Sequence, residues 1–108
     1  MAVHLTTRWG ADEEEPTVER MREVLAQLDE SDAEHPCVDL TDESGWSLGA
    51  YPSGTLVWEN VESDDEPRHM ASVGREQVLG LWIKLTEGRL TEIEAEPWVA
   101  GYGRSSTP

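Results

Sequence analysis

Apolar side chains recur at every second position near the start of the chain, which is the spacing of a β-strand. The alternation runs through Val3, Leu5, Thr7 and Trp9. It predicts a strand over residues 3–9, followed by an acidic loop at 12–15. The spacing then changes to steps of three and four, which predicts a helix over residues 17–29. The apolar stripe of this helix consists of Val18, Met21, Leu25 and Leu28.

Three shorter segments in the middle of the chain alternate in the same way, and turn residues separate them. The predicted strands cover residues 37–41, 46–50 and 55–61. Pro52-Ser53-Gly54 joins the last two as a hairpin turn, because glycine adopts the positive φ that such turns require. Trp46 and Trp58 are expected to face each other across this hairpin.

A further strand is predicted at 68–73 and a second helix at 75–86. The stripe of this helix is Val78, Leu81, Trp82 and Leu85, so Trp82 is expected to be buried, and Gly88 is a helix-ending glycine. Thr91 and Glu94 match a capping box, which favours a helical turn at 91–96. Ile93 and Ala95 also alternate as in a strand, so both alternatives stay open there. Trp98, beyond Pro97, is expected to cover an edge of the core.

Two apolar-striped helices need a surface to pack against, and one face of a sheet supplies it. The order of elements therefore predicts an α+β fold. Its expected form is a two-layer sandwich in which two helices cover one face of an antiparallel sheet of about four to five strands. The length of 108 residues suits a single domain, residues 1–100, with a flexible polar tail at 101–108.

The charge is strongly negative and falls in blocks. The chain has 23 Asp and Glu against 8 Lys and Arg, which gives a net charge of −15. The densest blocks are residues 12–15, 29–34 and 62–66. Such a charge opposes compaction, and a basic partner would offset it, although solubility alone is the simpler explanation. The same charge argues against direct binding to nucleic acid or an anionic membrane, because both require Lys and Arg.

No motif points to a catalytic centre, a metal or a cofactor. The histidines and Cys37 lack the spacing of a metal site or of a nucleophile with its base. The carboxylates lie in hydrophilic runs, where no desolvated pocket is expected to shift their pKa values. We therefore expect a protein that binds rather than catalyses. A single cysteine fits a reducing compartment, and no signal peptide or membrane span is visible, so a cytoplasmic location is expected.

One stretch combines aromatic and acidic side chains and is the predicted partner-binding surface. It comprises Tyr51, Trp58, Glu59, Glu62, Asp64 and Asp65. An aromatic anchor ringed by carboxylates suits a basic protein partner, whereas the alternative is a solvated loop beside a core tryptophan. If this surface is not used, the acidic residues 12–15 are the next candidate.

Several local strings resemble a known family. They are Gly45-Trp46-Ser47-Leu48, Gly54-Thr55-Leu56-Val57-Trp58, Arg68-His69-Met70 and the stretch 75–82. Over residues 3–98 they resemble small bacterial immunity proteins of polymorphic toxin systems, in particular the family with partners of double-stranded-DNA cytosine deaminase toxins. The chain is shorter than many members, and the shared strings are mainly structural. The resemblance implies a sheet with helices on one side. It also implies an acidic protein that neutralises a basic toxin domain by occluding its active site or substrate path.

Two other functions stay open. An acidic DNA mimic or anti-restriction modulator of a nucleic-acid enzyme would carry regularly spaced carboxylates along a convex surface. A small-molecule binding or enzymatic domain would have a deep apolar pocket and a carboxylate with a shifted pKa. The oligomeric state does not follow from the sequence.

Overall fold

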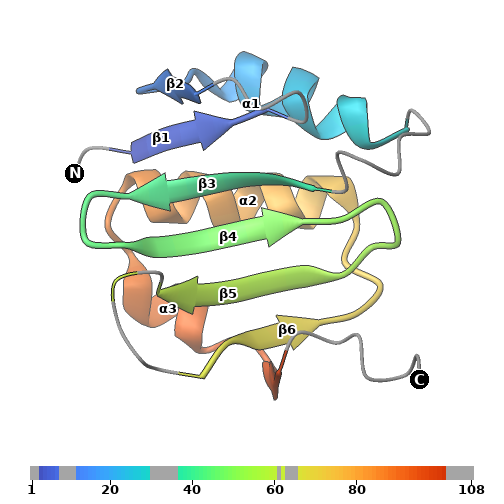
Figure 1. The fold of residues 1–108 in the computed structure, drawn as a ribbon, viewed down its shortest axis with the longest axis vertical. Coiled ribbons are helices and arrows are strands. Elements are labelled where there is room, and N and C mark those ends of the chain that lie inside the picture. Colours follow the sequence, from blue (N-terminus) through green and yellow to red (C-terminus); the bar gives the residue numbers. More distant parts are fainter. Residues whose placement is uncertain (1–2, 8–11, 30–36, 61, 63–65, 102–108) are drawn as a thin grey trace.

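The fold is built on one antiparallel sheet of seven strands with three α-helices, seen face-on in Figure 1. The computed structural model describes residues 3–7, 12–29, 37–60, 62 and 66–101. Within the sheet the strand order is β2-β1-β3-β4-β5-β6-β7. The strands are β1 Val3–Thr6, β2 Asp12–Glu14, β3 Val38–Asp42, β4 Trp46–Ala50, β5 Leu56–Asn60, β6 Arg68–Met70 and β7 Val99–Ala100. The helices are α1 Val18–Ala26, which continues as a 3-10 turn over Gln27–Asp29, α2 Arg75–Thr86 and α3 Leu90–Glu94.

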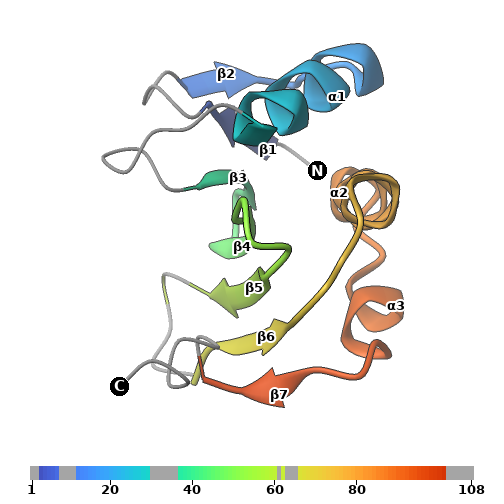
Figure 2. The ribbon, with the colours of Figure 1, turned by 90° about the vertical axis from the view of Figure 1, so that its right-hand side faces the viewer.

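All three helices lie on the same side of the sheet (Figure 2). The predicted two-layer α+β sandwich is therefore confirmed. The predicted size of the sheet is too small, because seven strands replace the expected four to five, and α3 adds a third helix. The extra strands, β2 and β7, form the two edges of the sheet.

The acidic block at 12–15 is part of the sheet and not the predicted loop. Backbone pairing with β1 aligns Glu14 with His4 and Asp12 with Thr6, and such pairing does not depend on apolar side chains. Thr6 Oγ1 also donates a hydrogen bond of 2.8 Å to Asp12 Oδ1. A short, charged strand of this kind suits a sheet edge, since charge there discourages pairing with another chain.

The C-terminal part resolves the alternatives that the sequence left open. Residues 90–94 are helical, so the strand alternative is wrong, but the cap of α3 is Arg89 and not the predicted Thr91. The strand predicted at 68–73 is shorter and covers only β6. β7 then returns to pair with β6, aligning Val99 with His69. Residues 102–108 of the predicted tail lie outside the described part of the chain.

The predicted helices are close to those observed. α2 has the predicted bounds, and Gly88 follows it with a φ of 74°. α1 begins after Thr17, whose Oγ1 accepts a hydrogen bond of 3.1 Å from Arg20 N. Val18 is 45% exposed, because the first residue of α1 points outward, and Val24 takes its place in the buried stripe.

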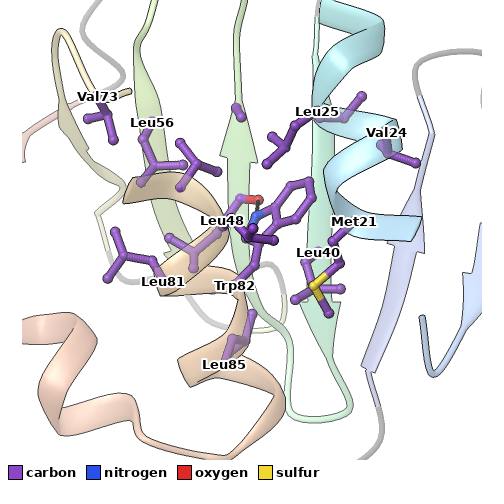
Figure 3. Close-up of a cluster of buried hydrophobic side chains, with 14 of the residues drawn as sticks. Met21, Val24, Leu25, Leu40, Leu48, Leu56, Val73, Leu81, Trp82 and Leu85 are labelled. Carbon is purple, nitrogen blue, oxygen red and sulfur yellow. Dashed lines mark hydrogen bonds between the residues drawn. The ribbon is translucent and has the colours of Figure 1, made fainter. Parts of the chain in front are cut away.

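Tryptophans organise the core between the two layers. Trp82 is fully buried, and its Nε1 donates a 3.0 Å hydrogen bond to the carbonyl oxygen of Leu48 on β4 (Figure 3). Trp46 and Trp58 stack with ring centroids 4.5 Å apart, and the half-buried Trp98 lies 6.2 Å from Trp58. The predictions of Trp46, Trp82 and Trp98 as packing residues are confirmed, and Trp58, which was also considered as an exposed anchor, is a core residue as well. Trp9 lies outside the described residues.

Candidate functional site: an acidic groove at one end of the sheet

The sheet face opposite the helices is polar. No described helix covers it, and alternate residues of each strand point away from the helices. Strand register aligns these residues in rows across the sheet. One row is Glu14, His4, Thr41, Ser47 and Glu59. The next row is Asp12, Thr6, Asp39, Gly49, Val57 and His69.

A groove of about 570 Å³ lies at one end of this sheet, where β1 and β2 meet the turn between β3 and β4. Its volume falls in the usual range for binding pockets. Ten described residues line it, and six of them carry carboxylates. The lining residues are Val3, His4, Asp12, Glu14, Glu15, Thr41, Asp42, Glu43, Gly45 and Glu62. No lysine or arginine is among these ten, and His4 is the one basic side chain in the described lining.

Backbone hydrogen bonds hold one wall of the groove. Glu15 follows β2 with a φ of 50°, which turns the chain back toward the start of β1. Its amide nitrogen donates to the carbonyl oxygen of Val3 at 3.0 Å, and Glu15 Oε2 accepts from the amide of Val3 at 3.3 Å. Pairing of β2 with β1 turns Asp12 and Glu14 to the uncovered face. The sequence run of acids is thereby converted into a wall with carboxylates on one side.

The opposite wall is the turn from β3 to β4, and Asp42 organises it. Asp42 Oδ1 accepts three hydrogen bonds, from Ser44 N at 2.9 Å, Ser44 Oγ at 2.8 Å and Trp46 N at 2.9 Å. This is the usual way in which an aspartate closes a turn on its own backbone. Asp42 is only 2% exposed, and its Oδ2 is buried with no hydrogen-bond partner among the described residues.

Glu62 belongs to a distant part of the chain and is tied to the same turn. Asn60 Nδ2 donates to the carbonyl oxygen of Ser44 at 3.2 Å, and Asn60 Oδ1 accepts from the amide of Glu62 at 2.8 Å. Gly45 has a φ of 95°, and a Cβ at this position would lie 2.4 Å from Glu62 Cγ. The missing side chain of Gly45 therefore lets Glu62 close against the turn.

The structure separates the residues of the predicted partner-binding surface. Trp58 is 0% exposed, so it packs between Trp46 and Trp98 and offers no surface to a partner. The prediction that Trp58 is an exposed aromatic anchor is wrong, because its side chain points to the helices. Tyr51 and Glu59 are half-buried on the uncovered face, outside the groove. Asp64 and Asp65 lie outside the described residues.

Of the described residues of the predicted partner-binding surface, Glu62 alone lines the groove. There it lies with the second candidate region, the acidic residues 12–15. Asp12, Glu14 and Glu15 line the same groove. Glu13 does not, because Arg20 Nε and Nη2 donate to its two oxygens at 2.8 and 2.6 Å. Two acidic blocks about 50 residues apart in the sequence thus form one site. Asp42 was not predicted, and an Asp two residues before Ser44 in a turn was the signal that could have found it.

Ionisable groups on the uncovered face outside the groove have shifted pKa values. Burial raises the pKa of Asp39 above its ordinary value, against hydrogen bonds from Thr41 and Thr6 that lower it. Burial also raises the pKa of Cys37, and the carboxylate of Asp39 adds to the shift. A raised thiol pKa disfavours the thiolate, so Cys37 is a poor nucleophile at neutral pH.

The described residues hold no group of three or more His, Cys, Asp or Glu side chains arranged for a metal ion. No helix in the described ranges is both long and apolar enough to cross a membrane.

Basic side chains accompany acids in the helical layer. Arg20 binds Glu13 and Glu23, Arg22 binds Glu76 from α1 to α2, and Arg68 Nη2 lies 3.3 Å from Glu94 Oε2. Lys84 and Arg89 likewise pair with acids around α3. Negative charge is therefore locally compensated beside the helices, in contrast to the described lining of the groove.

Comparisons with protein-family models, with curated proteins and with solved structures found no match to this chain. The fold and the groove define the protein only as an acidic, two-layer α+β domain with a carboxylate-lined groove at one end of its sheet.

Proposed function

We propose that this protein is an immunity-type inhibitor that binds a basic partner protein, a toxin domain, and blocks its active site or substrate path. The observation that carries the proposal is the groove. Six carboxylates from three parts of the chain line it, with no lysine or arginine among the ten lining residues. The resemblance of the hairpin and α2 strings to immunity proteins supports the same function.

Repulsion among the carboxylates of the groove would be removed by a positively charged partner. Carboxylates gathered in one concave region repel one another, and low-dielectric walls strengthen the field inside a cleft. A cationic surface that enters the groove removes this repulsion and gains attraction at the same time. Complementary charge also accelerates encounter, which suits an inhibitor that has to reach a toxin before the toxin reaches its target.

The nature of the groove supports this function over a small-molecule enzyme. The apolar pocket expected of such an enzyme would be lined mainly by hydrophobic and aromatic side chains. Here Val3 is the only large apolar residue among the ten that line the groove. The shifted carboxylate, Asp39, does not line the groove.

The test compares charge reversal in the groove with charge reversal on the helical layer. Glu14→Lys with Glu62→Lys changes two exposed groove residues, and Glu19→Lys with Glu96→Lys changes net charge equally beside α1 and α3. The partner is the basic protein recovered with the chain from its host, and the association rate is measured by surface plasmon resonance at low and moderate salt. Growth of cells that co-express the partner reports neutralisation.

We expect the groove variant to lose growth protection and to associate about tenfold more slowly or worse, because steering depends on local charge and is screened over about 10 Å at 0.1 M salt. The helical-layer variant should keep protection. Equal rates for the two variants, or a wild-type rate that ignores salt, would mean that the groove does not bind the partner and that the acidity serves solubility.

A further inference from the structure

Asp42 differs from the other carboxylates of the groove because it is buried. It is 2% exposed, whereas Glu14, Glu15, Glu43 and Glu62 are exposed and solvated. One of its oxygens, Oδ1, is saturated by three donors of the turn. The other, Oδ2, has no hydrogen-bond partner among the described residues. Buried acceptors are nearly always satisfied in proteins, so an unsatisfied one beside a groove indicates a donor that arrives from outside.

A second buried atom shows why this position matters. Trp58 Nε1 is also without a hydrogen-bond partner among the described residues, but its ring is enclosed between Trp46 and Trp98. Trp58 is not among the residues that line the groove. Asp42, by contrast, lines the groove, and both walls of the groove carry further carboxylates. The groove, and not the core, is therefore where an outside donor can meet an unsatisfied group.

We propose that Asp42 Oδ2 is the anchor for a single lysine ammonium of the basic partner, inserted into the groove between Glu15 and Glu62. This proposal rests on the proposed function and names the group that the groove recognises. Three features point to lysine rather than arginine, and each follows from the geometry of Asp42.

The first feature is the number of acceptors. A guanidinium binds a carboxylate best with two parallel hydrogen bonds, one to each oxygen. At Asp42 the backbone and side chain of Ser44 and the backbone of Trp46 already occupy Oδ1. A forked donor would have to displace these bonds and open the turn, whereas an ammonium needs only Oδ2.

The second feature is access. Oδ2 is buried, so the group that reaches it has to be slender. An ammonium is a compact charge on a narrow four-carbon stem, and a guanidinium is a broad plane. The third feature is the remaining donors. The ammonium carries three, and the rim carboxylates provide acceptors for the two that Asp42 does not use.

The volume of the groove indicates the size of the ligand that it can hold. At about 570 Å³ it exceeds the space of one side chain. It therefore admits a short loop or terminal segment of the partner, with the lysine at its deepest point.

The experiment titrates the isotope-labelled full chain with three peptides at constant ionic strength and follows backbone amides by NMR. The peptides are acetyl-Gly-Lys-Gly-amide, its arginine counterpart, and the same lysine peptide acetylated at Nζ, each raised to tens of millimolar. The amides of Ser44 and Trp46 report directly on Asp42, because both donate to Oδ1. We expect saturable shifts at these amides with the lysine peptide, binding about threefold weaker or worse with arginine, and no saturable shift with the acetylated peptide.

Asp42→Asn tests the anchor itself, because asparagine keeps one acceptor for the turn and replaces Oδ2 by a neutral amide. Asp39→Asn is the matched control, since it makes the same change three residues earlier on β3, outside the groove. Loss of a charged hydrogen bond should raise the Kd for the lysine peptide about tenfold or more in Asp42→Asn, against less than about twofold in Asp39→Asn. If Asp42→Asn does not fold, the three peptides on the wild-type chain still decide the matter.

Arginine binding as tightly as lysine, equal Kd changes in the two variants, or no saturable shift at Ser44 and Trp46 would overturn the proposal. The two proposals fail in different ways. If Asp42→Asn binds the basic partner normally while the groove reversals weaken it, the anchor is wrong and the proposed function stands. If the lysine peptide binds as expected but no partner depends on the groove, the proposed function is wrong and the anchor stands.

Discussion

The two faces of the sheet carry different kinds of side chain on the same strands. On the helix side, Leu48, Leu56 and Trp58 are 0% exposed and belong to the core between the sheet and the helices. On the other side, Ser47 and Glu59 are polar, whereas Val57, between Leu56 and Trp58, is apolar and buried. Burial of apolar area supplies the stability of the domain. The polar residues of the other side bury less apolar area and contribute less to that stability.

Charge is handled differently in the two regions as well. The arginines and Lys84 that accompany the helices have acidic partners, and exposed pairs of this kind contribute at most about 1 kcal/mol each. The groove gathers six carboxylates with no lysine or arginine among its described lining. On the proposed function, the partner supplies the cations that the described groove lining lacks.

The largest expected effect on stability comes from a substitution in the helix-covered face of the sheet. Trp82→Ala removes a fully buried indole between α2 and the sheet and leaves the carbonyl of Leu48 without its donor. Large-to-small changes of this kind cost about 3–5 kcal/mol in the free energy of unfolding. Urea denaturation monitored by circular dichroism measures it. A loss under about 1 kcal/mol would contradict the account of Trp82 as a central packing residue.

Periodicity predicted the helix-covered half of the molecule well. The stripe of α2 and the alternation of β3, β4 and β5 follow from burial on one side, which is a local property of the sequence. The edge strands escaped prediction because neither carries a long alternation of apolar and polar residues. β2 is an acidic run held by backbone pairing with β1, and β7 is two residues long.

The candidate site was predictable only in part. The acidic blocks that contain Glu14 and Glu62 were both singled out, but their meeting depends on strand order and on the turn at Gly45. The sequence left two roles open for Trp58, an exposed anchor and a core residue, and the structure shows the core residue, because its side chain points to the opposite side of β5 from that of Glu59. Asp42 Oδ2 is unsatisfied only in three dimensions, and no sequence pattern reports that.

The next prediction probes the boundary between the two regions. Gly45→Ala forces a non-glycine residue to a φ of 95° and brings its Cβ against Glu62. We expect a loss of about 1–3 kcal/mol, as strained backbone positions show. Gly80→Ala in α2 is the matched control, since nothing lies within 4 Å of the added Cβ and alanine favours a helix by about 0.5–1 kcal/mol. Thermal or urea unfolding gives both values. Equal effects at the two glycines would show that Gly45 is not needed to close the groove.

Removing charge sharpens the contrast further. Glu14→Gln with Glu62→Gln relieves repulsion in the groove and should raise the free energy of unfolding by about 0.5–1 kcal/mol at low salt, less at high salt. Glu76→Gln with Glu94→Gln removes two acids that are paired with Arg22 and Arg68, so it should give no gain. Urea melts at two salt concentrations distinguish the pairs. A gain of the same size in both would mean that net charge alone matters and that the groove has no special repulsion.

The smallest expected effect concerns Asp39, on the uncovered face outside the groove. Burial raises its pKa in the folded protein above the ordinary value of 3.8, while hydrogen bonds from Thr41 and Thr6 and the proximity of His4 act in the opposite direction. In the pH window between 3.8 and that raised pKa, the folded state holds the proton more often than the unfolded state. Stability from this group therefore falls as pH rises through the window and stays lower above it.

Asparagine does not titrate, so Asp39→Asn removes this pH dependence. The stability of the variant relative to wild type, given by the difference between their free energies of unfolding, should increase from pH 3 to pH 7. The measurement is a series of urea melts of both proteins across that range. Glu19→Gln is the control, because Glu19 is exposed on α1 and the substitution makes the same kind of change there. If the stability of Asp39→Asn relative to wild type does not change with pH, or declines as pH rises, ionised Asp39 does not destabilise the folded protein.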